Sequence, residues 1–199
     1  MGERQGSGPG ARRRPTLTEQ ARHEQLVEVT VELVADRGYG GATLSAIAER
    51  AGITKAAVLY HFASKDDLVR AAYQHVLDAL VGRVGAAVEA ADAADRPGAY
   101  VRSMIGHLRE HPTHVRMITE ALGHGEGGHA PETRWEPLAA ILADARRARH
   151  AGEGDDRTLA IALGGAIDAV VAERLHDPAY DTAAAAEELV RMVERALSA

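Results

Sequence analysis

Histidines and carboxylates are numerous enough in this chain to bind a metal ion. The chain has ten histidines and no cysteine, so a metal site would need imidazole and carboxylate ligands. His107, His111 and His114 form the densest group, and the first two fall on one helical face. No carboxylate completes a chelating signature such as H-E-x-x-H. The sequence predicts neither a metal site nor a cofactor, and partly buried or surface histidines are the expected explanation.

Paired carboxylates could instead serve catalysis. Asp66-Asp67, Asp155-Asp156 and Glu187-Glu188 fall at expected helix starts, where negative charge complements the helix dipole. The sequence contains no G-x-S-x-G motif and no G-x-x-x-x-G-K-[ST] motif. The letters GHGEGG at 123–128 follow an expected helix rather than a strand, so they cannot form a dinucleotide phosphate loop. The sequence therefore predicts that the protein is not an enzyme.

The segment 38–69, GYGGATLSAIAERAGITKAAVLYHFASKDDLV, carries a different chemistry. Two short helices are expected on either side of Ala51-Gly52-Ile53, and a threonine that can cap orphan amides precedes each of them. This spacing is typical of a helix-turn-helix, whose second helix can enter a DNA major groove. Any corner between two helices can imitate the spacing, so the pattern alone is only moderately specific.

In its residue types, the chain over roughly residues 22–70 resembles the DNA-binding domain of TetR-family transcriptional regulators. The residues that carry the resemblance are Gly38-Tyr39, Thr43, Ile47-Ala48, Ala51-Gly52-Ile53, Tyr60-His61-Phe62, Lys65 and Leu68. The resemblance implies that Thr43 meets a phosphate and that Tyr60, His61 and Lys65 anchor the DNA backbone. It further implies that the start of the recognition helix reads base edges; this part comprises Thr54, Lys55, Ala56 and Ala57.

Each of these residues also has a purely structural interpretation. Thr43 and Thr54 would cap helices in any protein, and Tyr60 could simply pack its ring. Lys65 could be a solvated residue of a first helical turn. A cation at a helix start opposes the helix dipole, however, and a nearby phosphate would explain it.

Apolar spacing predicts an all-α fold with a helix-turn-helix domain joined to a larger helical bundle. The expected domains are a flexible basic arm at 1–17, the DNA-binding domain at 18–63, and a ligand-binding and dimerisation domain at 64–199. A long helix from residue 64 to Pro97 should connect the last two. Arg12, Arg13 and Arg14 could reach DNA from the arm or form a solvated tail.

Net charge and hydropathy narrow the class of protein further. Residues 1–70 carry 10 basic and 9 acidic side chains, whereas residues 71–199 carry 13 and 20, so the net charge of -6 lies almost wholly in the second part. An acidic protein can still contain a module that faces phosphate. No apolar run reaches the length of a membrane helix and no secretory signal is evident, so we expect a cytoplasmic protein without a membrane partner.

The resemblance implies that the C-terminal helices form a ligand pocket and a homodimer interface. The pocket candidates are Tyr100, Met104, His107, Leu108, Met117, Trp135 and Leu138. The interface candidates, which form apolar stripes in the last two helices, are Leu159, Leu163, Ile167, Val170, Val171, Leu189, Val193 and Leu197. Ordinary core packing would give the same patterns. The pair Gly164-Gly165 suggests that another helix approaches closely there.

The expected function is that of a TetR-like regulator, a repressor that leaves a palindromic double-stranded operator when a small molecule binds. Two-fold symmetry matters because two recognition helices must reach successive major grooves. The alternative is a helical ligand-binding or scaffold protein without specific DNA binding, which the net charge of only +1 in residues 1–70 keeps open. The ligand, the operator and the direction of regulation cannot be deduced from the sequence.

Overall fold

The computed structural model describes residues 16–124 and 132–198, and within these ranges all regular structure is helical. The helices are α1 (Leu17–Gly41), α2 (Leu44–Arg50), α3 (Lys55–His61), α4 (Lys65–Ala90), α5 (Arg96–Glu110), α6 (Pro112–Gly123), α7 (Glu132–Ala148), α8 (Asp156–His176) and α9 (Thr182–Ser198). The predicted all-α fold is confirmed. The predicted arm with Arg12, Arg13 and Arg14, and most of the glycine-rich stretch after α6, lie outside the described residues.

The helix-turn-helix forms as its punctuating residues predict. Thr43 and Thr54 cap α2 and α3, each accepting a hydrogen bond from the backbone N–H three residues later over 3.1 Å. Gly52 has φ +68 between the two helices, in the left-handed region that glycine adopts without a steric penalty. The interpretation of the threonines as helix caps is therefore confirmed.

The end of α1 differs from the prediction that the helix stops at Gly38. Gly38 has φ 67 and breaks the helical geometry, but one further turn follows as far as Gly41. The glycine-rich sequence permits this change of direction, because glycine populates positive φ freely. Tyr39 is thereby placed at a bend between α1 and the helix-turn-helix.

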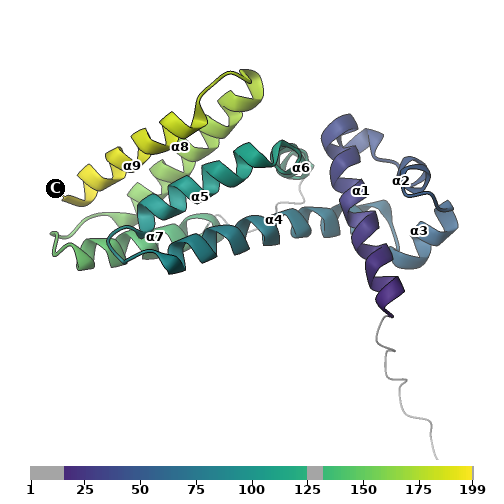
Figure 1. The fold of residues 1–199 in the computed structure, drawn as a ribbon, viewed down its shortest axis with the longest axis horizontal. Coiled ribbons are helices and arrows are strands. Elements are labelled where there is room, and N and C mark those ends of the chain that lie inside the picture. Colours follow the sequence, from purple (N-terminus) through teal and green to yellow (C-terminus); the bar gives the residue numbers. More distant parts are fainter. Residues whose placement is uncertain (1–15, 125–131, 199) are drawn as a thin grey trace, which may run out of the picture.

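The long connecting helix is shorter than predicted. It ends at Ala90, not at Pro97, and Pro97 instead lies in the first turn of α5. Proline favours a first helical turn because its missing N–H would be unsatisfied there anyway. Figure 1 shows α4 running from the helix-turn-helix on one side into the bundle of α5 to α9 on the other.

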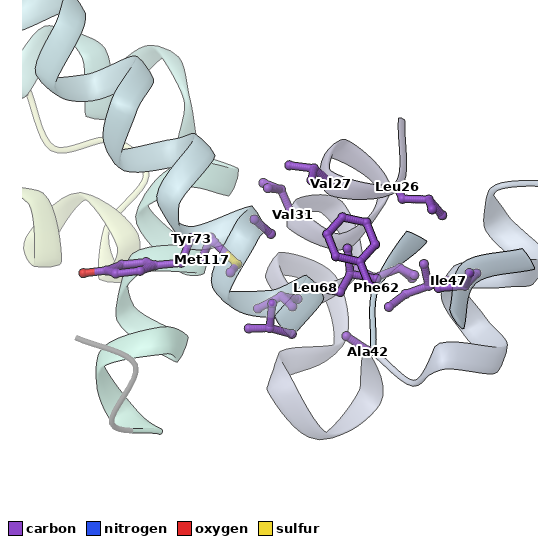
Figure 2. Close-up of a cluster of buried hydrophobic side chains, with 14 of the residues drawn as sticks. Leu26, Val27, Val31, Ala42, Ile47, Phe62, Leu68, Tyr73 and Met117 are labelled. Carbon is purple, nitrogen blue, oxygen red and sulfur yellow. The ribbon is translucent and has the colours of Figure 1, made fainter. Parts of the chain in front are cut away.

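The first hydrophobic core crosses the predicted domain boundary between residues 63 and 64. Its side chains come from α1 to α3, from the first half of α4, and from Met117 and Ala121 of α6. Figure 2 shows Phe62 in the middle of this cluster, with Met117 and Tyr73 at the end nearest the bundle. The helix-turn-helix therefore shares its apolar interior with a helix of the C-terminal part.

The second core lies within the bundle and contains five of the predicted interface residues. It includes Leu163, Ile167, Leu189, Val193 and Leu197, all buried within the single chain. Their stripes on α8 and α9 face each other and α5, so these side chains are covered within the single chain. Helical periodicity identifies a buried face but not what covers it.

Candidate nucleic-acid interface

The exposed face of α3 is the part of the structure best suited to meet DNA. Lys55, Ala56 and Tyr60 are exposed, with Tyr60 at 75% of its full surface. Val58, on the opposite side of the helix, is completely buried in the first core. The helix therefore presents one face to solvent, which also carries the exposed Leu59, as a helix lying in a major groove must do.

Thr43 and Thr54 combine their capping role with a donor that can face DNA. Each side-chain oxygen accepts from an amide of its own helix, and neither hydroxyl proton has an acceptor among the described residues. A hydroxyl can accept and donate at the same time. Both exposed threonines can therefore donate to a phosphate oxygen without giving up their caps.

Ala57 was predicted to read a base edge and His61 to contact the DNA backbone, but both side chains are less accessible than such contacts require. Both are half-buried, and the ring of His61 lies edge-on to that of Tyr60 with centroids 5.2 Å apart. The Tyr60 hydroxyl lies 3.3 Å from a carboxylate oxygen of Glu19, in the first turn of α1. The start of α1 thus lies beside the recognition helix.

Lys65 is engaged inside the protein rather than fully solvated. Its ammonium group donates to the backbone carbonyl of Tyr39 and lies 4.0 Å from the centroid of that tyrosine ring. The Tyr39 hydroxyl donates in turn to Asp66. Because an ammonium has three N–H donors, Lys65 retains donors for a phosphate while holding the bend after α1.

Two residues of this site were missed as functional candidates. Tyr39 belongs to the pair Gly38-Tyr39, and its position beside a predicted helix end could have identified it as a candidate. Glu120, on α6, accepts from the Tyr39 backbone N–H over 2.9 Å. These partners are 81 residues apart in sequence, and no periodicity or motif connects them.

The predicted pocket residues divide between the two cores. Met117 is buried in the first core, whereas Leu138 is buried in the second, with Tyr100, Met104 and Trp135 packed partly buried against it. His107 is buried and Leu108 half-buried. The three aromatic and methionine side chains at the edge of the second core are consequently the ones that an apolar ligand could reach.

The three neighbouring histidines do come together, at the corner between α5 and α6. Nε2 of His107 and Nδ1 of His114 are 3.1 Å apart, and the ring of His111 contacts both. Burial and the adjacent imidazoles lower the pKa of His114 to about 4 and also lower that of His107. Among residues 16–124 and 132–198, no three potential ligands are placed to hold a metal ion.

One face of α8 stays exposed although it is largely apolar. It consists of Ile161, Ala162, Gly165, Ala169, Ala172 and Leu175, and the exposed carboxylate of Asp168 lies among them. A Cβ added to Gly164 or Gly165 would have no atom of the described chain within 4 Å. The close approach expected at this glycine pair is therefore not made within the described chain.

Hydropathy along the helices bears on membrane association. Within the described ranges, no helix is both long and apolar enough to span a bilayer.

Sequence similarity to known proteins is concentrated in the N-terminal part of the chain, which contains the helix-turn-helix. Residues 26–72 match the profile of the family described as "Bacterial regulatory proteins, tetR family". A segment of 120 residues is 34% identical to the HTH-type transcriptional activator FasR of Mycolicibacterium smegmatis, covering 60% of this chain and 54% of FasR. Over 84 residues it is 34% identical to the HTH-type transcriptional regulator BetI of Burkholderia thailandensis, covering 42% of each protein.

Solved structures extend the similarity to the whole fold. A TetR-like transcriptional regulator from Rhodococcus sp. RHA1 superimposes with a TM-score of 0.74 at 23% identity, covering 93% of this chain and 98% of that one. FadR from Bacillus subtilis, solved with stearoyl-CoA, gives a TM-score of 0.68 at 19% identity, covering 86% and 97%. At these identities the superpositions establish the fold alone.

A helix-turn-helix with an exposed second helix, joined to a helical bundle, defines the class of two-part helical DNA-binding proteins. Residues 26–72 carry the match to the TetR family of bacterial regulatory proteins, and the chain shares the fold of TetR-like regulators. The matched segments span about half the length of the curated relatives or less. What those relatives regulate is therefore not transferred to this chain by similarity.

Proposed function

We propose that the protein is a homodimeric transcriptional regulator, a repressor that binds a palindromic operator through α2 and α3. The observation that carries this proposal is the exposed row of Thr54, Lys55, Ala56 and Tyr60 on a helix whose other side is buried. Lys55 can pair with guanine and the methyl group of Ala56 can contact thymine. Thr43, Tyr60 and Lys65 supply the contacts to the backbone.

Dimerisation is supported by the uncovered apolar face of α8. Its small residues would let a helix of a second copy approach closely, and Gly164 and Gly165 have free space above them. Two-fold symmetry would present the same face from both subunits. Of the original interface candidates, Leu159, Val170 and Val171 are only half-buried and can flank this contact.

A small-molecule ligand is supported by the apolar edge of the second core. Tyr100, Met104 and Trp135 are partly buried there and offer aromatic and thioether surface. A ligand that prefers one arrangement of the bundle would shift the spacing of the two recognition helices and lower DNA affinity. Stearoyl-CoA, which was bound to the structurally similar FadR, is a suitable first probe for an acyl ligand.

The test is selection of duplexes from a random DNA pool by the purified full-length chain, with the molar mass measured in parallel. Recovery of a palindromic motif by a particle of twice the chain mass of 21.1 kDa is the expected result. Binding of the selected duplex is then measured with and without stearoyl-CoA. Such a regulator acts in the cytoplasm, where bacterial DNA lies.

Binding that depends on salt but selects no motif would contradict this function. That outcome would favour a helical ligand-binding or scaffold protein that retains only the shape of the helix-turn-helix. The protein must be tested free of copurified ligand, since a bound ligand could suppress DNA binding. Unfolding and refolding before one selection provides that control.

A further inference from the structure

The bend Gly38–Tyr39 is one place where the C-terminal part contacts the phosphate-facing part of the chain. The Tyr39 backbone N–H donates to Oε2 of Glu120, and the Tyr39 ring stacks on that of His124 at 4.3 Å and 18°. Glu120 and His124 both lie at the end of α6. A single tyrosine therefore meets α6 through its backbone and through one side of its ring.

The same tyrosine holds the first turn of α4. Its carbonyl accepts from the ammonium of Lys65, its ring lies beneath that ammonium, and its hydroxyl donates to Asp66. Lys65 immediately follows Ser64, which caps α4 by accepting from the Asp67 N–H over 3.0 Å. The position of Lys65 is thus set by Tyr39 as well as by its own helix.

Backbone geometry makes this bend sensitive to its neighbour on α6. Gly38 has φ 67, and a Cβ added there would lie 3.1 Å from Oε2 of Glu120. The carboxylate therefore lies directly against the bend. Only glycine combines this φ with the space that Glu120 needs.

We infer that Tyr39 is a positioning residue for DNA binding and that Glu120, by accepting its backbone N–H, holds Lys65 where it can donate to a phosphate. This inference rests on the proposed function and names the contact by which the C-terminal part can regulate it. A movement of the end of α6 that withdraws Glu120 would free the bend and loosen the hold on Lys65. Glu120 itself does not touch DNA.

The experiment compares full-length variants on the duplex that the wild-type protein selects. Glu120→Ala removes the acceptor, and we expect about 5-fold to 10-fold weaker binding on every sequence, as for a lost phosphate contact. Glu120→Gln keeps a carbonyl acceptor and should restore most of the affinity. Thr119→Ala, at the neighbouring α6 residue whose hydroxyl bonds only within its own helix, is the matched control and should bind as the wild type does.

The double variant Glu120→Ala with Lys65→Ala separates positioning from general destabilisation. If Glu120 acts through Lys65, the double variant binds no more weakly than Lys65→Ala alone, and both have the same reduced salt dependence. Melting temperatures of all variants verify that each is folded. Unchanged or tighter binding by Glu120→Ala, failure of Glu120→Gln to restore affinity, or multiplicative losses in the double variant would each overturn the inference.

Failure of the proposed function gives a different result. If the wild-type protein selects no duplex, the DNA-binding function fails before any variant is compared. If it selects one and the variants behave independently, the function stands and only the role of Tyr39 and Glu120 is wrong.

Discussion

Arg146 of α7 and Asp156 of α8 form an ion pair with little access to solvent. Nε of Arg146 lies 3.0 Å from a carboxylate oxygen of Asp156, and the two side chains keep only 12% and 18% of their exposed surface. A Cβ on Gly154 would lie 2.5 Å from the guanidinium. The connection between α7 and α8 is therefore built closely around this pair.

Asp156→Asn should lower the free energy of unfolding by about 1–3 kcal/mol, because it leaves a partly buried guanidinium without its counter-charge. Denaturant unfolding followed by circular dichroism measures the change. The control is Asp36→Asn, whose ion pair with Arg37 is exposed and should contribute within about 0.5 kcal/mol. Equal losses in the two variants would show that the lower exposure of the first pair has no energetic consequence.

Met117→Ala should destabilise the first core by about 2–5 kcal/mol, since the side chain is fully buried where α6 meets the helix-turn-helix. Hydrogen exchange should then accelerate in α1 and in the first half of α4 as well as in α6. Leu142→Ala, fully buried in the second core, is the matched comparison and should act mainly on α7 and α8. Confinement of the Met117→Ala effect to α6 would contradict the shared interior.

Ala169→Arg should convert the proposed dimer to a monomer, because it places a long charged side chain on the largely apolar exposed face of α8. Light scattering should then report the chain mass of 21.1 kDa instead of twice that value. Affinity for the operator should fall at the same time, since a monomer presents one recognition helix. Ala140→Arg, at an exposed position of α7, is the control and should remain dimeric.

Acid should destabilise the corner between α5 and α6. The pKa of His114 is about 4 in the folded protein, below the usual value of 6.5. Between these values the unfolded chain binds more protons than the folded chain, so stability is fully present above about pH 6.5 and is lost as the pH falls toward 4. The slope is at most about 1.4 kcal/mol per pH unit for one proton.

His114→Gln should flatten the pH dependence of stability. The control is His150→Gln, which alters an exposed histidine of the α7–α8 connection and should leave the pH dependence unchanged. Urea unfolding at a series of pH values from 4 to 7 gives the slope for each variant. Parallel curves for wild type and His114→Gln would mean that other groups determine the acid response.

Lys55→Ala and Thr54→Ala should change which base pairs are preferred in a repeated duplex selection. The cost at the affected position should be about 1–3 kcal/mol of discrimination if a bidentate contact to guanine is lost. Tyr60→Phe should instead weaken all duplexes alike, because its hydroxyl is proposed to contact the DNA backbone. An unchanged motif from the Lys55 variant would exclude it as a base-reading residue.

The sequence predicted best what depends on neighbouring residues. Thr43, Gly52 and Thr54 act within one turn of their own position, so local physical rules identified the caps and the bend. The sequence could not determine what covers Leu163 and Val193, because burial by the same subunit and by a second one require the same helical stripe. Glu120 could not be found, because its contact with Tyr39 depends on how α6 packs against α1.

The burial of Met117 in the same core as Phe62 affects how this protein can be recombined with others. A chimera joined at Ser64 would transfer α1 to α3 but leave Met117 and Ala121 against an interior they do not fit. Exchange of DNA specificity should therefore replace only the exposed residues of α3, or carry the inward face of α6 along with the helix-turn-helix. The residues that must be transferred together are those that form the first core, and they come from two separate segments of the sequence.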